Sequence, residues 1–190
     1  MMQVITAFDE GALLFLQDNV RSGALDALMR GITALGNAGA VWIAVSILFL
    51  CIRRYRKCGV VMLSALVFCT LINTVLLKNL VQRARPFDVV KGLTILIGRP
   101  SGFSFPSGHT STSFACAWAI MSMEKKFAVP AFILAALIAF SRVYVGVHYP
   151  TDVMAGAVIG IMCGVVVCLA YRRFFAEKLF VPKGENDGES

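Results

Sequence analysis

The chain contains two histidines, and each stands next to the start of an apolar run. His109 ends the tetrapeptide PSGH, and His148 precedes Asp152 by four residues. Histidine is the side chain best suited to proton transfer near neutral pH. A carboxylate that accepts a hydrogen bond from one ring nitrogen leaves the other as a nucleophilic lone pair. We therefore interpret His148 as a candidate nucleophile, Asp152 as its partner and His109 as a candidate general acid.

A set of cations and small polar residues accompanies the histidines. Unpaired Lys and Arg are costly at membrane level, whereas a phosphate neutralises them and fits the Arg fork. A glycine lets the backbone come close to an anion, and free N–H groups at a helix start favour it. The predicted phosphate-binding residues are Lys78, Arg85, Ser107, Gly108 and Arg142. Because Lys and Arg would meet the phosphoryl charge in place of Mg²⁺, we expect neither a metal nor a cofactor.

Each of these residues also has a purely structural interpretation. His109 could be a helix cap, and Arg142 could extend its charged end towards the membrane interface. Asp152 could be an acid favoured by the dipole of the helix that it starts. Lys78 could simply end an apolar run. These interpretations do not explain why all the groups fall at corresponding ends of the apolar runs.

Five apolar runs must position these residues. A helix of about 20 apolar residues spans a bilayer, and the runs approach or reach that length at 35–52, 58–77, 107–123, 127–146 and 150–171. We predict an all-α integral membrane bundle of about five transmembrane helices. Antiparallel alternation places the end of the second run, the start of the third, the end of the fourth and the start of the fifth on one side. Both histidines, the three cations and the carboxylate then converge.

The N-terminal residues differ from these runs. Apolar and charged positions alternate over residues 4–30, which predicts an amphipathic helix lying at the membrane interface. A short sixth span is the alternative. The predicted organisation is therefore an interfacial segment at 1–34, a transmembrane catalytic core at 35–175 and a polar tail at 176–190.

Composition supports a multi-pass protein of the cell membrane. The chain is 58% hydrophobic with a mean hydropathy of +0.76, above the roughly 45–50% apolar content of soluble domains. The net charge of +7 is divided among separate loops, which argues against a nucleic-acid partner. Basic loops at 53–57, 124–126 and 171–173 fall on one side, which predicts that this side is cytoplasmic. The candidate site would then face the extracytoplasmic side.

Three motifs resemble the signature of a known family. They are K-x6-RP (Lys78 to Pro86), PSGH (Pro106 to His109) and SR-x5-H-x3-D (Ser141 to Asp152), present in order and without departures. Together they are similar to the type 2 phosphatidic acid phosphatase superfamily. The resemblance implies a helical bundle and metal-independent phosphate ester or diphosphate hydrolysis through a phosphohistidine. It implies the same roles for the residues named above.

The chain has little beyond this core, and it resembles the compact bacterial undecaprenyl-diphosphate and phosphatidylglycerophosphate phosphatases of that superfamily. We expect hydrolysis of undecaprenyl diphosphate to undecaprenyl phosphate, with phosphatidic acid or phosphatidylglycerophosphate as the alternative substrate. The expected partners are the lipid phosphate and membrane lipids, and the oligomeric state is left open. The non-enzymatic alternatives are a phospholipid-binding or flippase-like protein and, third, a small transporter. Binding alone needs the cations but not His148 and Asp152 at this spacing, so the sequence favours hydrolysis.

Overall fold

The computed structural model describes residues 2–176, and the regular elements in that part of the chain are all helical. This confirms the predicted all-α membrane bundle. The helices are α1 Met2–Asn19, α2 Gly23–Leu35, α3 Ala40–Cys51, α4 Arg56–Leu71, α5 Lys78–Val81, α6 Pro86–Val89, α7 Gly108–Met123, α8 Ala128–Tyr144 and α9 Pro150–Tyr171. Short helical turns join several of them, including η1 Asn37–Gly39 and η3 Ile72–Leu77.

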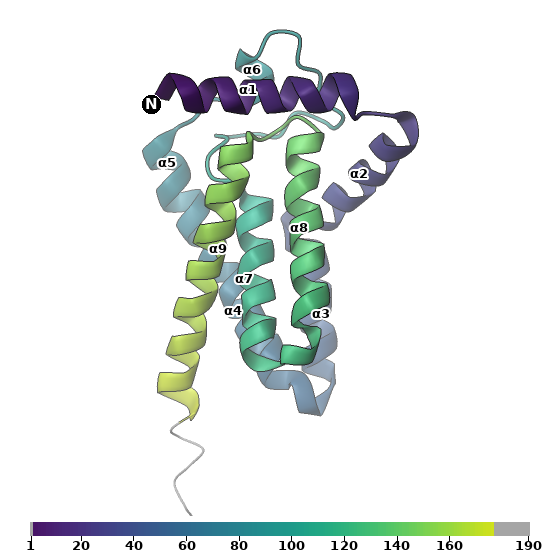
Figure 1. Cartoon of the computed structure of the whole chain (residues 1–190). Helices are drawn as coiled ribbons and strands as arrows, with labels where there is room; N and C mark the ends of the chain where they lie inside the picture. The colour runs from purple at the N-terminus through teal and green to yellow at the C-terminus, as the bar shows by residue number, and fades with distance from the viewer. Residues whose placement is uncertain (1, 177–190) are drawn as a thin grey trace, which may run out of the picture.

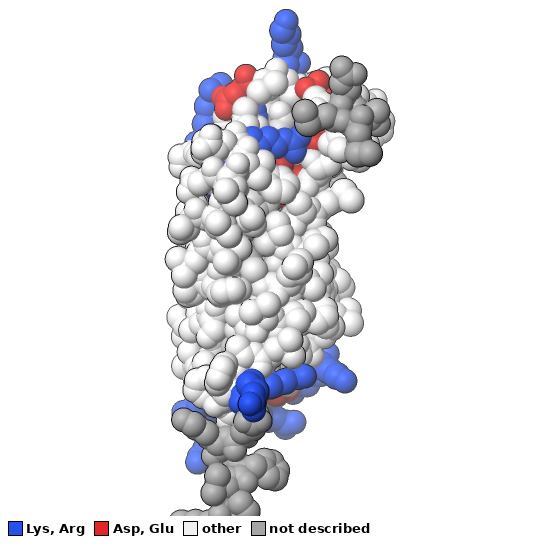
Figure 2. All heavy atoms as spheres, turned by 90° about the vertical axis from the view of Figure 1, so that its left-hand side faces the viewer, with Lys and Arg blue, Asp and Glu red and all other residues white. Residues whose placement is uncertain are grey.

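The apolar helices give the molecule the surface of a membrane protein. Within residues 2–176, the segments Arg53–Val89, Lys125–Tyr144 and Pro150–Phe175 are long and apolar enough to cross a bilayer. The helices on either side of a 51° bend, Gly23–Leu35 and Asn37–Cys51, would form a fourth span if they act together. Figure 2 shows one face, on which charged side chains gather at the two ends and leave a broad uncharged band between them.

All five predicted runs form helices, although the number that cross the membrane stays a prediction. Helix α7, over the third run, is 16 residues long and is surrounded by α4, α8 and α9. Most of its residues are therefore buried in protein. A helix that touches other helices instead of lipid can carry serine and threonine, which explains the run Thr110, Ser111, Thr112 and Ser113 in α7.

Helices α7 and α9 pack at unusually short range. Gly156, Gly160 and Gly164 lie one turn apart on the side of α9 that faces α7. A Cβ atom at Gly160 would come within 2.2 Å of the backbone oxygen of Ser111. Small residues at four-residue spacing let two membrane helices approach closely. This contact brings the start of α7, with its PSGH motif, next to the start of α9.

Helix α1 runs across the end of the bundle at which α7 and α9 begin and α8 ends, as Figure 1 shows. The loop that follows α6 is tied to it, because the side chain of Gln17 bonds to Gly92 and Thr94. This placement fits the predicted interfacial helix.

The predicted amphipathic region at 4–30 folds as two helices, since α2 turns away from α1 and leads into α3. The predicted division at residues 34 and 35 stays a prediction. The polar tail lies outside the described residues beyond 176.

Candidate active site

The structure brings the predicted site residues together at the end of the bundle covered by α1. They come from five places: α5, the segment before α6, the start of α7, the last turn of α8 and the α8–α9 connection with the start of α9. Their charges are close enough to interact, because Lys78 lies within electrostatic range of Arg85, Arg142 and Asp152. His109 likewise interacts with His148.

His148 and Asp152 form the pair that their spacing predicts. Both side chains are buried, and Nδ1 of His148 lies 3.5 Å from Oδ2 of Asp152. The hydroxyl of Ser104 donates to the same carboxylate oxygen at 2.5 Å and lies 3.4 Å from Nδ1. The backbone N–H of Tyr149 also donates to it at 3.1 Å. Asp152 therefore caps its helix and orients the histidine at once, and Nε2 is the ring nitrogen that remains for chemistry.

His148 is neutral at physiological pH. Burial lowers its pKa to about 4, with Asp152 opposing this effect and the cations Arg142 and Arg85 adding to it. An imidazole without a second proton retains a lone pair. The environment of His148 therefore suits a nucleophile.

The three predicted phosphate-binding cations have no carboxylate within ion-pair distance among residues 2–176. Arg85 is buried and donates to the backbone carbonyls of Ser101, Gly102 and Val147. Arg142 is 2% exposed, and its Nη1 donates to Thr33 Oγ1 at 2.7 Å. Its Nε has no hydrogen-bond partner in the described part of the chain. Buried arginines that have no carboxylate at ion-pair distance within residues 2–176 are suited to bind an anion.

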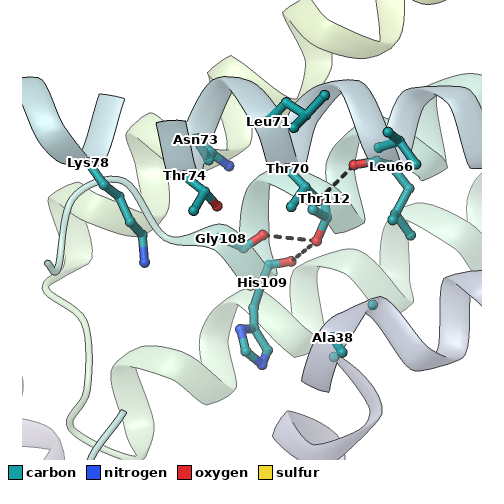
Figure 3. A pocket seen from close by; sticks show the side chains of 13 residues that line it. Ala38, Leu66, Thr70, Leu71, Asn73, Thr74, Lys78, Gly108, His109 and Thr112 are labelled. Carbon is teal, nitrogen blue, oxygen red and sulfur yellow. Dashed lines mark hydrogen bonds between the residues drawn. The ribbon is translucent and has the colours of Figure 1, made fainter. Parts of the chain in front are cut away.

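Lys78 and His109 border a cavity of about 400 Å³ in the side of the bundle. Its walls come from η1, from α4 with η3, and from the start of α7, and most of them are apolar. Figure 3 shows Lys78 and His109 near one another, with Leu66 and Leu71 further along the cavity. Lys78 and His109 thus border a cavity whose walls are largely apolar.

The kink between α2 and α3 holds His109 in place. Nε2 of His109 lies 3.1 Å from Oδ1 of Asn37 in η1, so a protonated Nε2 donates to that amide oxygen. A Cβ atom at Gly36 would lie 2.6 Å from the imidazole, so glycine is the residue that fits there.

Ser107 and Gly108 lie where the PSGH motif predicts a helix start. Ser107 is buried, its N–H donates to the backbone oxygen of Asp152 at 3.1 Å, and its hydroxyl accepts from Thr110. Gly108 is the first residue of α7 and lines the cavity. The space around its Cα is open, because a Cβ there would meet nothing within 4 Å.

The sequence reasoning missed Asp9, Arg83, Ser104, Thr33 and Asn37. Arg83 bridges two acids, since Nη1 lies 2.7 Å from Asp152 and Nη2 lies 2.6 Å from Asp9. Asp9 offered one signal, because at helical spacing it shares the apolar face of Leu13 and Leu16. An acid on a buried face needs a partner. The other four residues carried no comparable local signal.

The described residues offer no evident metal centre. No group of three or more His, Cys, Asp or Glu side chains between residues 2 and 176 is placed to hold a metal ion. The predicted independence of the reaction from metal stays a prediction.

Comparison with known proteins identifies the family. Residues 58–176, well over half of the chain, match the PAP2 superfamily. This chain belongs to that superfamily. All three sequence motifs lie within the matched region. The resemblance drawn from them is therefore confirmed, and the match together with relatives named as phosphatases indicates a lipid phosphatase.

Relatives within the superfamily are named for different lipids. The chain is 36% identical over 121 residues to an undecaprenyl-diphosphatase of Sulfolobus acidocaldarius, a match that covers 63% of this chain and 58% of that protein. It is 35% identical over 157 residues to phosphatidylglycerophosphatase B of Bacillus subtilis, covering 75% and 73%.

The fold extends the similarity beyond the matched region. The crystal structure of Aquifex aeolicus LpxE resembles this structure with a TM-score of 0.71 at 28% identity, over 90% of this chain and 94% of that one. The shared fold is therefore longer than the matched stretch 58–176.

Proposed function

We propose that this protein hydrolyses the terminal phosphate of a membrane lipid diphosphate at the extracytoplasmic face, through a phosphohistidine on His148. The observation that carries this proposal is the pairing of a neutral, oriented imidazole with three cations that have no carboxylate partner among residues 2–176. A phosphate between them supplies the missing negative charge and places phosphorus within reach of His148. Lys78, Arg85 and Arg142 are then the groups that meet the charge on the phosphoryl oxygens.

The proposed reaction has two steps. Nε2 of His148 attacks phosphorus, the bond from phosphorus to the leaving oxygen breaks, and His109 gives that oxygen its proton. Asp152 stabilises the positive character that develops on the His148 ring. In the second step His109 accepts a proton from water, the water oxygen attacks phosphorus, and the phosphorus–nitrogen bond breaks. Ser107 and the N-terminal N–H groups of α7 bind phosphoryl oxygens in both steps.

The apolar cavity supports a lipid substrate. Lys78 and His109 border it together with Leu66, Val67 and Leu71, and the last two of these side chains are exposed on the flank of the bundle. A headgroup can therefore approach Lys78 and His109 while the adjoining chain remains against apolar residues. A soluble phosphate ester would gain nothing from such walls.

An isoprenoid diphosphate is the proposed substrate, supported by the name of the Sulfolobus relative. The name of the Bacillus relative supports the alternative, phosphatidylglycerophosphate. Phosphate release in detergent from undecaprenyl diphosphate, phosphatidylglycerophosphate and phosphatidic acid distinguishes them. We expect the largest kcat/KM with undecaprenyl diphosphate and no release by His148→Ala. A preference for phosphatidylglycerophosphate would replace the substrate and leave the site assignment intact. Binding without release from any lipid would favour the phospholipid-binding or flippase-like alternative.

Metal independence follows from the proposed charge compensation. Because Lys78, Arg85 and Arg142 meet the phosphoryl charge, phosphate release should be unchanged after treatment with EDTA. The measurement compares initial rates of the purified protein before and after chelation and after adding Mg²⁺ back. A strict requirement for Mg²⁺ would contradict the mechanism.

A further inference from the structure

The carboxylate of Asp152 is held from two sides. One oxygen, Oδ2, faces His148 and accepts from Ser104 and from the N–H of Tyr149. The other, Oδ1, accepts from Nη1 of Arg83 at 2.7 Å. Asp152 thus has a face towards the nucleophile and a second face whose only side-chain contact among the described residues is Arg83.

Arg83 is itself fixed by helix α1. Asp9 of that helix is fully buried, and its Oδ2 accepts from Nη2 of Arg83 at 2.6 Å. Asp9 also accepts from the backbone N–H of Thr151 at 3.0 Å, which ties it to the first turn of α9. The guanidinium lies over the ring of Tyr149, with its carbon 3.9 Å from the ring centroid. Residue 9 lies outside the stretch 58–176 that matches the superfamily.

These contacts separate Arg83 from the three proposed phosphate ligands. Both of its terminal nitrogens point at carboxylates, whereas Arg85 and Arg142 have none within ion-pair distance in the described chain. A guanidinium that already bridges two carboxylates has little capacity left for a phosphate. Its geometry instead fixes where Oδ1, and therefore the whole carboxylate, can lie.

We propose that Arg83 and Asp9 are positioning residues. They act on the reaction by holding the carboxylate of Asp152 in contact with the ring of His148. The inference rests on the proposed roles of those two residues. A carboxylate held on one face only can rotate away from the imidazole, and misplacement of a catalytic group by about 1 Å can cost up to 10²-fold in rate. Helix α1, anchored through Asp9, thereby becomes part of the catalytic apparatus.

Other charged and titratable groups lie around His148 and could also affect its reactivity. They are Asp152 on α9, Arg142 on α8, His109 on α7 and Arg85 before α6. Arg83 reaches this set only through Asp152. Its replacement should therefore change catalysis without weakening the binding of phosphate.

The test uses the full-length protein in detergent with a chromogenic phosphate ester. The variants are Arg83→Gln, Arg83→Lys, the near-isosteric Asp9→Asn and, as a matched control on the exposed side of α1, Asp18→Asn. For each we would measure kcat, KM and inhibition by inorganic phosphate. We expect kcat of Arg83→Gln to fall by up to about 10²-fold, with KM and phosphate inhibition unchanged. Arg83→Lys should recover part of the rate, Asp9→Asn should lie between, and Asp18→Asn should match the parent protein.

Two results would overturn the inference. Weaker inhibition by phosphate in Arg83→Gln would show that Arg83 is a phosphate ligand. An unchanged kcat in both Arg83→Gln and Asp9→Asn would show that Arg83 and Asp9 do not position Asp152. Should Arg83→Gln fail to fold, as judged by thermal unfolding, Asp9→Asn decides the question, since it preserves the size of the side chain. Full activity of His148→Ala in the same series would refute the proposed function itself, so the two failures are distinguishable.

Discussion

His148 and His109 are proposed to act differently, and the side chains that they contact differ. His148 is buried against Asp152, whereas His109 is partly exposed at the cavity beside Asn37. A nucleophile cannot be replaced by solvent in a double-displacement reaction, while a missing general acid slows a reaction without abolishing it. The two histidines should therefore give distinct phenotypes.

His148→Ala should abolish both turnover and the phosphorylated protein. His109→Ala should slow turnover by about 10²–10⁴-fold with a poor leaving group, the usual contribution of general acid catalysis. The defect should shrink with a nitrophenolate leaving group, which needs little protonation. Rapid-quench trapping of acid-labile phosphate on the protein provides the measurement. Phosphate found on His109, or full activity of His148→Ala, would reverse the assignment.

The pH dependence of the free enzyme should reflect the lowered pKa of His148. Burial brings this pKa to about 4, so the ring stays neutral and nucleophilic while the pH falls from 7 to 5. An ordinary histidine would lose half of its nucleophilic form near pH 6.5. The acid limb of kcat/KM, corrected for ionisation of the substrate, should therefore lie well below pH 6.5. The expectation would be contradicted if kcat/KM fell with an acid limb near pH 6.5 and this limb stayed at the same pH in His109→Ala.

At the scale of helices, the site depends on how closely α7 approaches α9. Gly156, Gly160 and Gly164 make that approach possible, and the outward positions Met154, Val158 and Met162 of α9 are exposed at the same four-residue spacing. One face of α9 therefore packs against α7 and the opposite face meets lipid. Any side chain on the inner face must push apart the two helix starts that carry PSGH and Asp152.

Gly160→Ala should destabilise the protein and reduce activity together. Its Cβ atom would lie 2.2 Å from the backbone oxygen of Ser111, and backbone cannot move aside as a side chain can. Overpacking of this kind costs about 1–3 kcal/mol or more. The matched control is Gly31→Ala in α2, where a Cβ atom meets nothing within 4 Å. Thermal unfolding and phosphate release measured on both variants test the expectation, and equal behaviour of the two would refute it.

At the scale of the whole molecule, charge is divided between the two ends. The basic residues that join α3 to α4 lie at one end of the bundle. The candidate site and the loop containing Lys91 lie at the other end. Excess Lys and Arg in short loops mark the cytoplasmic side. The motif cations are accounted for by the proposed phosphate site, so the remaining cluster, Arg53, Arg54, Arg56 and Lys57, predicts a cytoplasmic end opposite the site.

Cysteine labelling in intact cells can test this orientation. Lys91→Cys, an exposed position in the loop after α6, should react with a membrane-impermeant maleimide. The native Cys51, exposed at the opposite end, is an internal control and should react only after lysis. The other five cysteines are buried. Labelling of Cys51 in intact cells, with Lys91→Cys protected, would reverse the orientation.

The sequence by itself determined the class of the fold and the family. The lengths of the apolar runs placed helices close to their observed bounds, as for α9, which begins at Pro150 and ends at Tyr171 as predicted. Those signals are local, because a membrane helix must satisfy its own backbone and meet lipid along its length. Antiparallel alternation then sufficed to bring Lys78, Arg142 and both histidines to one end.

Only the tertiary structure decided what holds those residues in place. Asp9 meets Arg83 across 74 residues of chain, Thr33 meets Arg142 across 109, and Asn37 meets His109 across 72. The partners in these contacts cannot be identified from the sequence, even where spacing marks Asp9 as a buried acid, because each contact depends on where a helix from one part of the chain packs against another. The residues that do the proposed chemistry were therefore readable from the sequence, whereas the residues that orient them became visible only when the N-terminal helices were folded against the bundle.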